Sequence, residues 1–593
     1  MKKCFSKSLA VGLTGLMALG TVLTGCGGSS GSSDSSSTEF TWLLDITPDS
    51  YYYVDYEENP VAKYWENMEW TSDGTTAKIS IEFDEPLAGS ETDHFNNMIA
   101  TGEYADVMGM QNASDTPASL YDQGVVIDLT DYVDKYMPNY KQWLEDNPVY
   151  ARQMTSRIDG EDRILMLYNV NDAVGSPWEC FMYRRDWLAK YGTNPETGEA
   201  FTGGWNEDKT EWTDDVVFPS GGTNPVYISD WEWMFDIFTK ALEAEGITDG
   251  YAMQMMYTGY YEDGDLTSSF GGGRIGTYVT ADGQTAYGGD TDSARAYLEC
   301  MNTWYENGWL DPEFEENSSD TAFFTIDIDS VYNGKVGMWI GVTNQLENML
   351  ATGADPEAGL DDICVKGAAQ PINDIYGTDE CKNVIPDTFY QNTMFTSGVV
   401  LTDKAEAKDI GKLLTAIDYF YSREGSKMLT MGLDADQQAE AQDPLYIEYG
   451  LDDGAYSVET RDGEEWLVAA PEIMTTDGLL DAACGMRLVG LGAQKNKDIG
   501  YSAGQMESMD QSIMYEATGN LGVAYTGLLS SETSAELSLV NTSVDTYLAV
   551  SIPDFITGRS DINDDAEWQA YCDELESLGA HRMSEEINKC LAE

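Results

Sequence analysis

Short apolar or alternating segments define the predicted strands in the first part of the chain. Phe40–Leu44 and Tyr104–Met110 are apolar runs of strand length, and Ile79–Phe83 alternates apolar and polar residues. Val125–Leu129 is the next apolar run. Because helical signals separate these segments, the pattern favours a parallel sheet in an α/β fold.

Helix signals lie between and beyond these strands. Asn59 is placed to cap a helix that has Pro60 at its first position. Ser90 precedes a second helix, whose apolar face contains Phe95 and Met98. Apolar residues at helical spacing predict further helices over Asp230–Glu245, over Asp403–Ser422 and, as at least two helices, over residues 545–593.

The first residues have the pattern of an export signal. Lys2, Lys3 and Lys7 form a basic head, and an apolar run follows from Leu9 to Gly25. This order, with small residues before a cleavage point, is typical of a secretory signal. The run is at the short limit for spanning a bilayer, which takes about 20 residues. Residues 1–25 are therefore interpreted as a signal peptide.

A cysteine and a polar segment follow the apolar run. Leu23-Thr24-Gly25-Cys26 resembles the lipobox of bacterial lipoproteins, in which the cysteine is lipidated and becomes the first residue of the mature chain. Residues 26–38, rich in Gly and Ser, are interpreted as a flexible tether. These features place the protein at the outer face of a cell membrane. A plain N-terminal membrane anchor is the alternative.

The composition is globular and strongly acidic. The 593 residues are 42% hydrophobic, which suffices for a core, and this length exceeds one ordinary domain, so two or more lobes are expected. The chain has 104 acidic and 32 basic residues, and its net charge is −72. Such a surface repels phosphate backbones, which excludes nucleic acid as a partner and favours neutral ligands over anionic ones.

The cysteine and histidine residues point to no disulfide framework, metal site or catalytic triad. The cysteines beyond Cys26 have irregular spacing, which indicates neither a disulfide framework nor a zinc pattern. Cys364 and Cys381 flank a loop-like segment, and their pairing is left open. The two histidines, His94 and His581, are far apart, so a His-based metal site or a Ser-His-Asp triad is hard to build. No cofactor or metal is expected.

Seven local motifs occur in a fixed order along the chain. They are Gly89–Asp93, Thr101–Val107, Leu120–Leu129, Tyr183–Leu188, Asn333–Trp339, Tyr421–Ser426 and Phe555–Arg559. Their order, together with the lipobox, resembles the extracellular solute-binding proteins of bacterial ABC transporters, in the carbohydrate-binding group that includes maltose-binding protein. The resemblance covers essentially the whole mature chain. Residues 196–225 and 434–535 look like elaborations of it.

The resemblance implies a fold and a place for the ligand. The fold would be two-lobed α/β, of the type II periplasmic-binding-protein class, with several crossings between the lobes. The first lobe would hold residues 39–155 with 386–433, and the second would hold residues 160–385 with 434–593. Ligand is expected in the cleft, where strand ends and helix N-termini of both lobes converge.

The resemblance also implies a set of cleft residues. A neutral sugar needs aromatic platforms and planar polar side chains. Trp339 is the leading candidate for such a platform, whereas core packing explains Trp42 equally well. Helix capping is the alternative role for the residues that follow Ser90. The ligand-binding candidates are Trp42, Asp45, Glu91, Gln111, Asn112, Trp178, Trp339 and Asn344.

The function implied is that of a binding protein and not of an enzyme. It would be a monomeric, lipid-anchored receptor that captures an oligosaccharide and delivers it to the permease of an ABC importer. A receptor for another neutral solute, such as a peptide, and a surface glycoside hydrolase are the alternatives. Carboxylate pairs do not decide the second alternative, because 104 acidic residues always supply some.

Overall fold

The computed structural model of the chain describes residues 37–45, 52, 55–171, 179–207, 212–255, 266–280, 283–316, 333–342, 363–386, 395–461, 464–474, 484–486, 488–492 and 528–592. The interpreted signal peptide, Cys26 and nearly all of the interpreted tether lie outside these residues. Within the described residues, no helix combines the length and the apolar character that a membrane crossing requires.

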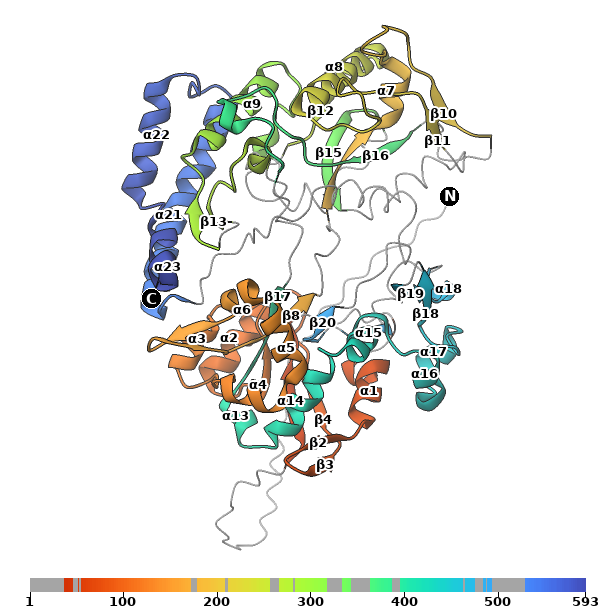
Figure 1. The fold of residues 1–593 in the computed structure, drawn as a ribbon, viewed down its shortest axis with the longest axis vertical. Coiled ribbons are helices and arrows are strands. Elements are labelled where there is room, and N and C mark those ends of the chain that lie inside the picture. Colours follow the sequence, from red (N-terminus) through yellow and green to blue (C-terminus); the bar gives the residue numbers. More distant parts are fainter. Residues whose placement is uncertain are drawn as a thin grey trace, which may run out of the picture.

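Two separate sheets organise the chain, one in each lobe (Figure 1). The first sheet has the strand order β20-β8-β17-β5-β1-β4. Strand β1 pairs in parallel with β4 and with β5, as the sequence predicts, whereas β17 is antiparallel to both β5 and β8, so the sheet is mixed. Its strands are β1 (Glu39–Leu43), β4 (Ser80–Asp84), β5 (Val107–Gly109), β8 (Leu167–Asn171), β17 (Phe395–Leu401) and β20 (Leu491–Gly492).

Two of the connecting helices begin where the sequence predicts. Helix α1 (Pro60–Asn67) starts with proline, and the Asn59 side chain accepts hydrogen bonds from the N–H groups of Val61 (2.9 Å) and Ala62 (3.0 Å). Helix α2 (Glu91–Thr101) follows Ser90 and buries Phe95. The other α-helices described in this lobe are α3 (Pro117–Asp122), α4 (Thr130–Tyr136), α5 (Pro138–Asp146), α6 (Pro148–Gln153), α13 (Asp403–Glu406), α14 (Ile410–Tyr419), α15 (Arg423–Met431), α16 (Ala435–Ala441), α17 (Pro444–Glu448) and α18 (Pro471–Met474).

Two predicted elements of this lobe are wrong. Val125–Leu129 forms a single bridge, between Val126 and Thr402, and no strand. The helix predicted over Asp403–Ser422 is two helices, α13 and α14, because Asp409 caps α14 through a hydrogen bond from the N–H of Lys412 (3.2 Å). In both cases the apolar pattern is real, and its residues are buried, but the backbone leaves the regular conformation.

The outer edge of the first sheet is covered by carboxylates. Strand β4 is the last strand of the order, so alternate N–H groups along it point away from β1. The N–H of Ile81 donates to the carboxylate of Glu66, and the N–H of Phe83 donates to that of Glu57 (3.2 Å). Side chains thus occupy the hydrogen-bonding positions of a neighbouring strand.

The second sheet has the order β12-β15-β9-β16. Its strands are β12 (Tyr251–Met253), β15 (Val336–Val342), β9 (Glu179–Arg184) and β16 (Val365–Ala368). Helices α7 (Arg185–Tyr191), α8 (Ile228–Glu245) and α9 (Asp292–Glu306) build its aromatic core, in which Trp231 and Trp304 stack at 6.2 Å. Helix α8 confirms the helix that the sequence predicts over Asp230–Glu245.

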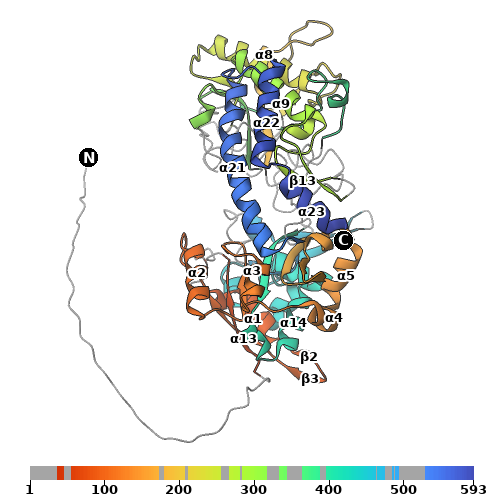
Figure 2. The same ribbon diagram turned by 90° about the vertical axis from the view of Figure 1, so that its left-hand side faces the viewer.

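Three helices close the chain, which confirms the prediction of at least two. They are α21 (Ser531–Ile556), α22 (Asp565–Leu578) and α23 (Arg582–Ala592). Ile552 and Phe555 of α21 and Tyr571 of α22 are buried in the core of the second lobe. Figure 2 shows α21 and α22 along one side of this lobe, with α21 extending down to the first lobe.

The lobe boundaries differ from the expected ones in two places. Strand β8 lies in the first sheet, and residues 433–491 contribute Tyr446 and Leu467 to the core of that lobe, whereas the sequence analysis assigned both segments to the second lobe. The chain therefore passes between the lobes after β8, before β17 and after β20. These memberships depend on pairing with distant strands, which a local pattern does not contain.

The first of the two elaborated segments is held to the second lobe by buried ion pairing. Strands β10 (Gly203–Trp205) and β11 (Trp212–Asp214) form an antiparallel ribbon. Asp214 accepts two hydrogen bonds from Arg185, at 2.6 and 2.9 Å, and both side chains are almost fully buried. The Trp205 indole N–H donates to the carbonyl of Ile363 (3.0 Å). This ribbon is an integral part of the lobe.

The disulfide considered from the sequence is not formed. Cys381 is a buried free thiol in the second lobe. Cys364 is also buried; its backbone carbonyl accepts a hydrogen bond from the N–H of Arg185 (2.8 Å), and its N–H donates to Asp186 (3.2 Å).

Candidate ligand-binding edge of the first lobe

Polar side chains follow two neighbouring strands at one edge of the first sheet. Because β1 and β5 are parallel, their carboxyl ends reach the same edge, which carries Asp45 after β1 and Gln111 and Asn112 after β5. Strand β8 ends at this edge as well, since two antiparallel pairings relate it to β5 through β17. The carboxyl-end edge of an α/β sheet is where ligands bind.

Asp45 is fixed at this edge by the residues after β5. Its Oδ1 accepts a hydrogen bond from the backbone N–H of Gln111 (2.7 Å), and its backbone carbonyl accepts one from the side-chain amide of Asn112. A Cβ atom at Gly109 would collide with the Asp45 carboxylate, so the glycine makes this approach possible. The three residues that the sequence predicts here are therefore brought together.

The environment of Asp45 changes its acidity. Burial raises the pKa of Asp45 from 3.8 to about 6, and the hydrogen bond from Gln111 opposes part of this rise. In the described part of the chain, no group donates a hydrogen bond to Oδ2 of Asp45. A half-buried carboxylate with one oxygen available can accept a hydrogen bond from a ligand hydroxyl.

Four aromatic rings gather around the end of β8 and form what we call the aromatic edge: Trp143, Tyr150, Tyr168 and Phe395. They come from α5, α6, β8 and the first residue of β17. Phe395 contacts Tyr168 edge-to-face with ring centroids 5.5 Å apart, and Tyr150 with centroids 6.4 Å apart. Trp143 is nearly buried, while the other three rings are partly exposed. Partly exposed rings suit the apolar C–H face of a sugar.

The residues of the aromatic edge are not predicted from the sequence. Tyr168 and Phe395 are far apart in the chain and meet only because β17 pairs with β8. The one local signal is the pair of Met-Pro and Asn-Pro steps that start α5 and α6, the helices that carry Trp143 and Tyr150.

Trp42 lies in the hydrophobic core and not in the cleft. Its side chain is 1% exposed, and its ring contacts that of Trp65 edge-to-face at 6.5 Å. Strand alternation explains this placement, because Phe40, Trp42 and Leu44 share the helix-covered face of the sheet. Of the two roles considered for Trp42, core packing is therefore the one that the structure shows.

Glu91 and His94 make contacts within the first lobe. The Glu91 carboxylate accepts a hydrogen bond from the N–H of Gly89 (3.0 Å) at the start of α2, and such backbone donors lower the pKa of Glu91. His94 pairs with Asp84 at 3.0 Å. The Glu91 carboxylate is therefore engaged at the start of α2.

Trp339 is fully buried in β15 of the second lobe. It lies opposite Met182 of β9, and no described residue accepts a hydrogen bond from its indole N–H. The ring is thus not presented at a surface in this arrangement. Trp178 and Asn344 lie outside the described residues.

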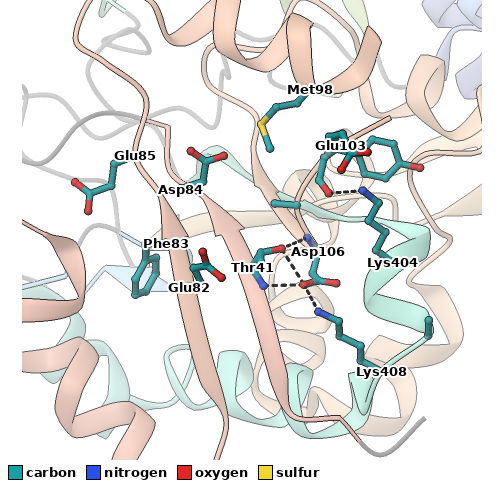
Figure 3. A pocket seen from close by; sticks show the side chains of 13 residues that line it. Thr41, Glu82, Phe83, Asp84, Glu85, Met98, Glu103, Asp106, Lys404 and Lys408 are labelled. Atoms are coloured by element: carbon teal, nitrogen blue, oxygen red, sulfur yellow. Dashed lines mark hydrogen bonds and ion pairs between the residues drawn. The ribbon is translucent and has the colours of Figure 1, made fainter. Parts of the chain in front are cut away.

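A pocket of about 650 Å³ lies on another face of the first lobe, beside β1 and β4 (Figure 3). Asp106 lies at its base and accepts hydrogen bonds from the N–H of Thr41 (2.7 Å) and from Lys408 (2.7 Å). Lys404 donates to the carbonyls of Gly102 and Tyr104, both at 2.9 Å. These lysines connect the α13 region to the sheet. Among the described residues, no three acidic, histidine or cysteine side chains are placed to hold a metal ion.

Known proteins were compared with this chain. No protein-family model matches it. The fructooligosaccharide ABC transporter substrate-binding protein FusA of Streptococcus pneumoniae is 22% identical over 402 residues, which cover 59% of this chain and 68% of FusA. An extracellular solute-binding protein from Bifidobacterium longum subsp. infantis is structurally similar, with a TM-score of 0.63 and 16% identity over 93% of this chain and 98% of that chain. The alginate-binding protein AlgQ2 gives a TM-score of 0.59 and 15% identity over 95% and 99% of the two chains.

The chain has the fold of these two solved binding proteins. The two-lobed α/β architecture that the sequence resemblance implies is confirmed, and so is the resemblance itself. Figure 1 shows β8 and β20 at the side of the first lobe that faces the second lobe.

Proposed function

We propose that this chain is the extracellular, lipid-anchored solute-binding component of an ABC importer. It captures an oligosaccharide between its two lobes and delivers it to the permease as a monomer. The similarity to a fructooligosaccharide-binding transporter component supports the assignment. The lipobox-like Cys26 and the Gly/Ser-rich residues after it support the anchor.

The observation that carries the proposal is the edge of the first sheet. It combines a held carboxylate, Asp45, with a neighbouring amide side chain, Asn112, and with the partly exposed rings of the aromatic edge. Hydroxyl acceptors next to aromatic faces are the groups that recognise a neutral sugar. This binding needs no acid–base pair, which favours a receptor over a hydrolase.

The first test is ligand-induced stabilisation of residues 27–593. Melting temperatures are measured with fructo-, alginate- and plant oligosaccharides, with short peptides as controls. A ligand at 100 times its Kd adds about 2.7 kcal/mol to the free energy of unfolding, so the melting temperature rises. A saturable sugar response without product formation supports the proposal. A response to peptides alone, or degradation of the sugar, contradicts it.

The Asp45→Asn variant makes this test specific to the site. The substitution keeps the shape of the side chain and removes its charge, so the sugar response should weaken while the fold remains. The control is Asp162→Asn, because Asp162 forms an exposed pair with Arg157 away from the edge.

A further inference from the structure

The C-terminal helix of the second lobe reaches the first lobe. Arg152, on α6, donates a hydrogen bond from Nη2 to the backbone carbonyl of Leu591, near the end of α23 (3.1 Å). Figure 2 shows α23 and the C-terminus directly above the first lobe, next to α5. This bond therefore joins elements of different lobes.

An apolar cluster accompanies this hydrogen bond. Tyr150 of α6 packs against buried residues that all follow α6 in the sequence, from Val279 onward. We call the whole group the inter-lobe cluster. It contains Val279, Leu528, Leu529, Leu537 and Ile587, with Met583, Cys590 and Leu591 partly buried beside them. Tyr150 is the first-lobe member of the cluster.

Helix α23 itself is firmly held by the second lobe. The side chain of Asn588 accepts hydrogen bonds from the N–H (2.8 Å) and the hydroxyl (2.9 Å) of Thr285, and it donates one to the carbonyl of the same residue (2.8 Å). Thr285 lies in β14 (Thr285–Tyr287), which pairs with β13 (Thr277–Val279). Helix α23 thus moves with the second lobe.

Tyr150 belongs to two groups at once. Its side chain packs into the inter-lobe cluster. Its ring centroid also lies 6.4 Å from that of Phe395 and 6.4 Å from that of Trp143, which both belong to the aromatic edge. Any rotation of one lobe against the other changes the contact between α6 and α23. The position of the Tyr150 ring at the cleft is therefore linked to the arrangement of the lobes.

We propose that Arg152 and Tyr150 are positioning residues for ligand binding: the docking of α23 on α6 holds the Tyr150 ring in the aromatic edge and so couples the lobe arrangement to affinity. This inference rests on the proposed function, because it assigns a ligand to the aromatic edge. A contact made in one lobe arrangement shifts the population toward that arrangement.

The test compares variants that remove the contact from either side. Arg152→Ala removes the donor, and it should weaken affinity for the oligosaccharide found by thermal shift about threefold to tenfold, which is the size of one net hydrogen bond. Truncation after Asn588 removes the Leu591 carbonyl and also the Cys590 and Leu591 side chains of the inter-lobe cluster, so its loss should be at least as large, while the bonds between Asn588 and Thr285 remain. In the double variant, Arg152→Ala should add no further loss to that of the truncation, since its acceptor is already absent.

Controls separate positioning from general destabilisation. Arg152→Lys retains a donor and should restore most of the affinity. Arg157→Ala removes an arginine from a surface pair of the same lobe and should leave affinity unchanged. Unchanged affinity in Arg152→Ala, or additive losses in the double variant, overturns the inference.

A ligand-free measurement distinguishes failure of this inference from failure of the proposed function. Fluorescent labels on the two lobes report the inter-lobe distance by energy transfer in the unliganded chain. The distance distribution should change in Arg152→Ala and return in Arg152→Lys. No change overturns the coupling whatever the ligand is, whereas a change in a chain that binds no sugar overturns only the proposed function.

Discussion

The two lobes place their charged side chains in opposite ways. In the second lobe, Asp186 and Asp214 are buried within two-point ion pairs with Arg184 and Arg185. In the first lobe, Asp45 stands at a sheet edge without a cationic partner among the described residues, and burial raises its pKa to about 6. A paired buried carboxylate serves the fold, whereas a carboxylate held half-buried by one backbone N–H is suited to receive a donor from outside.

The largest expected effect is the loss of a second-lobe pair. Arg185→Ala leaves Asp214 buried without its partner, so the free energy of unfolding should fall by about 3–5 kcal/mol. Urea denaturation measures this change. Lys190→Ala, which removes an exposed pair with Glu245, is the control and should cost at most about 1 kcal/mol. A similar small cost for Arg185→Ala would remove the contrast between the lobes.

The next effect concerns the first-lobe carboxylate. Asp45→Asn should weaken sugar affinity about tenfold to a hundredfold, because a hydrogen bond to a charged group contributes about 1.5–3 kcal/mol. Isothermal titration calorimetry measures the affinity. Stability at neutral pH should not fall, since the wild-type carboxylate is ionised there against its raised pKa. An unstable variant with normal affinity would instead give Asp45 a structural role.

The pH dependence of binding sharpens the same point. The folded-state pKa of Asp45 is about 6 against 3.8 in the unfolded chain, so this group destabilises the fold as pH rises from 3.8 to 6. Binding that needs the ionised form has the opposite trend: affinity should fall about tenfold from pH 7 to pH 5. Titrations at several pH values should show this slope in the wild type and a flat profile in Asp45→Asn. A slope in both would assign the pH dependence to another group.

The smallest effect is expected at Glu91. Its carboxylate is occupied with the N–H of Gly89 at the start of α2. Glu91→Gln should therefore change ligand affinity by less than about twofold and leave the free energy of unfolding nearly unchanged. A large loss of affinity, measured by calorimetry, would return this residue to the cleft.

Local signals predicted the parts of the fold that depend on neighbouring residues. The cap of α1 by Asn59, the start of α2 after Ser90 and the positions of β1 and β4 follow from patterns within a few residues. The lobe membership of β8 does not, because its partners β17 and β20 lie hundreds of residues away. The resemblance to a known family supplied the two-lobed architecture.

The residues of the candidate site also fall into those that local patterns predict and those that depend on distant parts of the chain. Asp45, Gln111 and Asn112 follow strands that the sequence predicts, so their meeting at one edge could be foreseen. Trp42 has the residue type of a sugar platform, yet strand alternation turns it into the core. Phe395 gave no signal, since its strand β17 meets Tyr150 of α6 only in the folded chain.

The carboxylates along the outer edge of β4 have a consequence for self-association. An exposed strand edge offers free N–H groups on which a second copy of the chain can extend the sheet. Here Glu57 and Glu66 already accept those hydrogen bonds, and two such edges approaching each other would meet like charge with like charge. The protein can therefore be concentrated at a surface without joining its sheets into fibres through this strand.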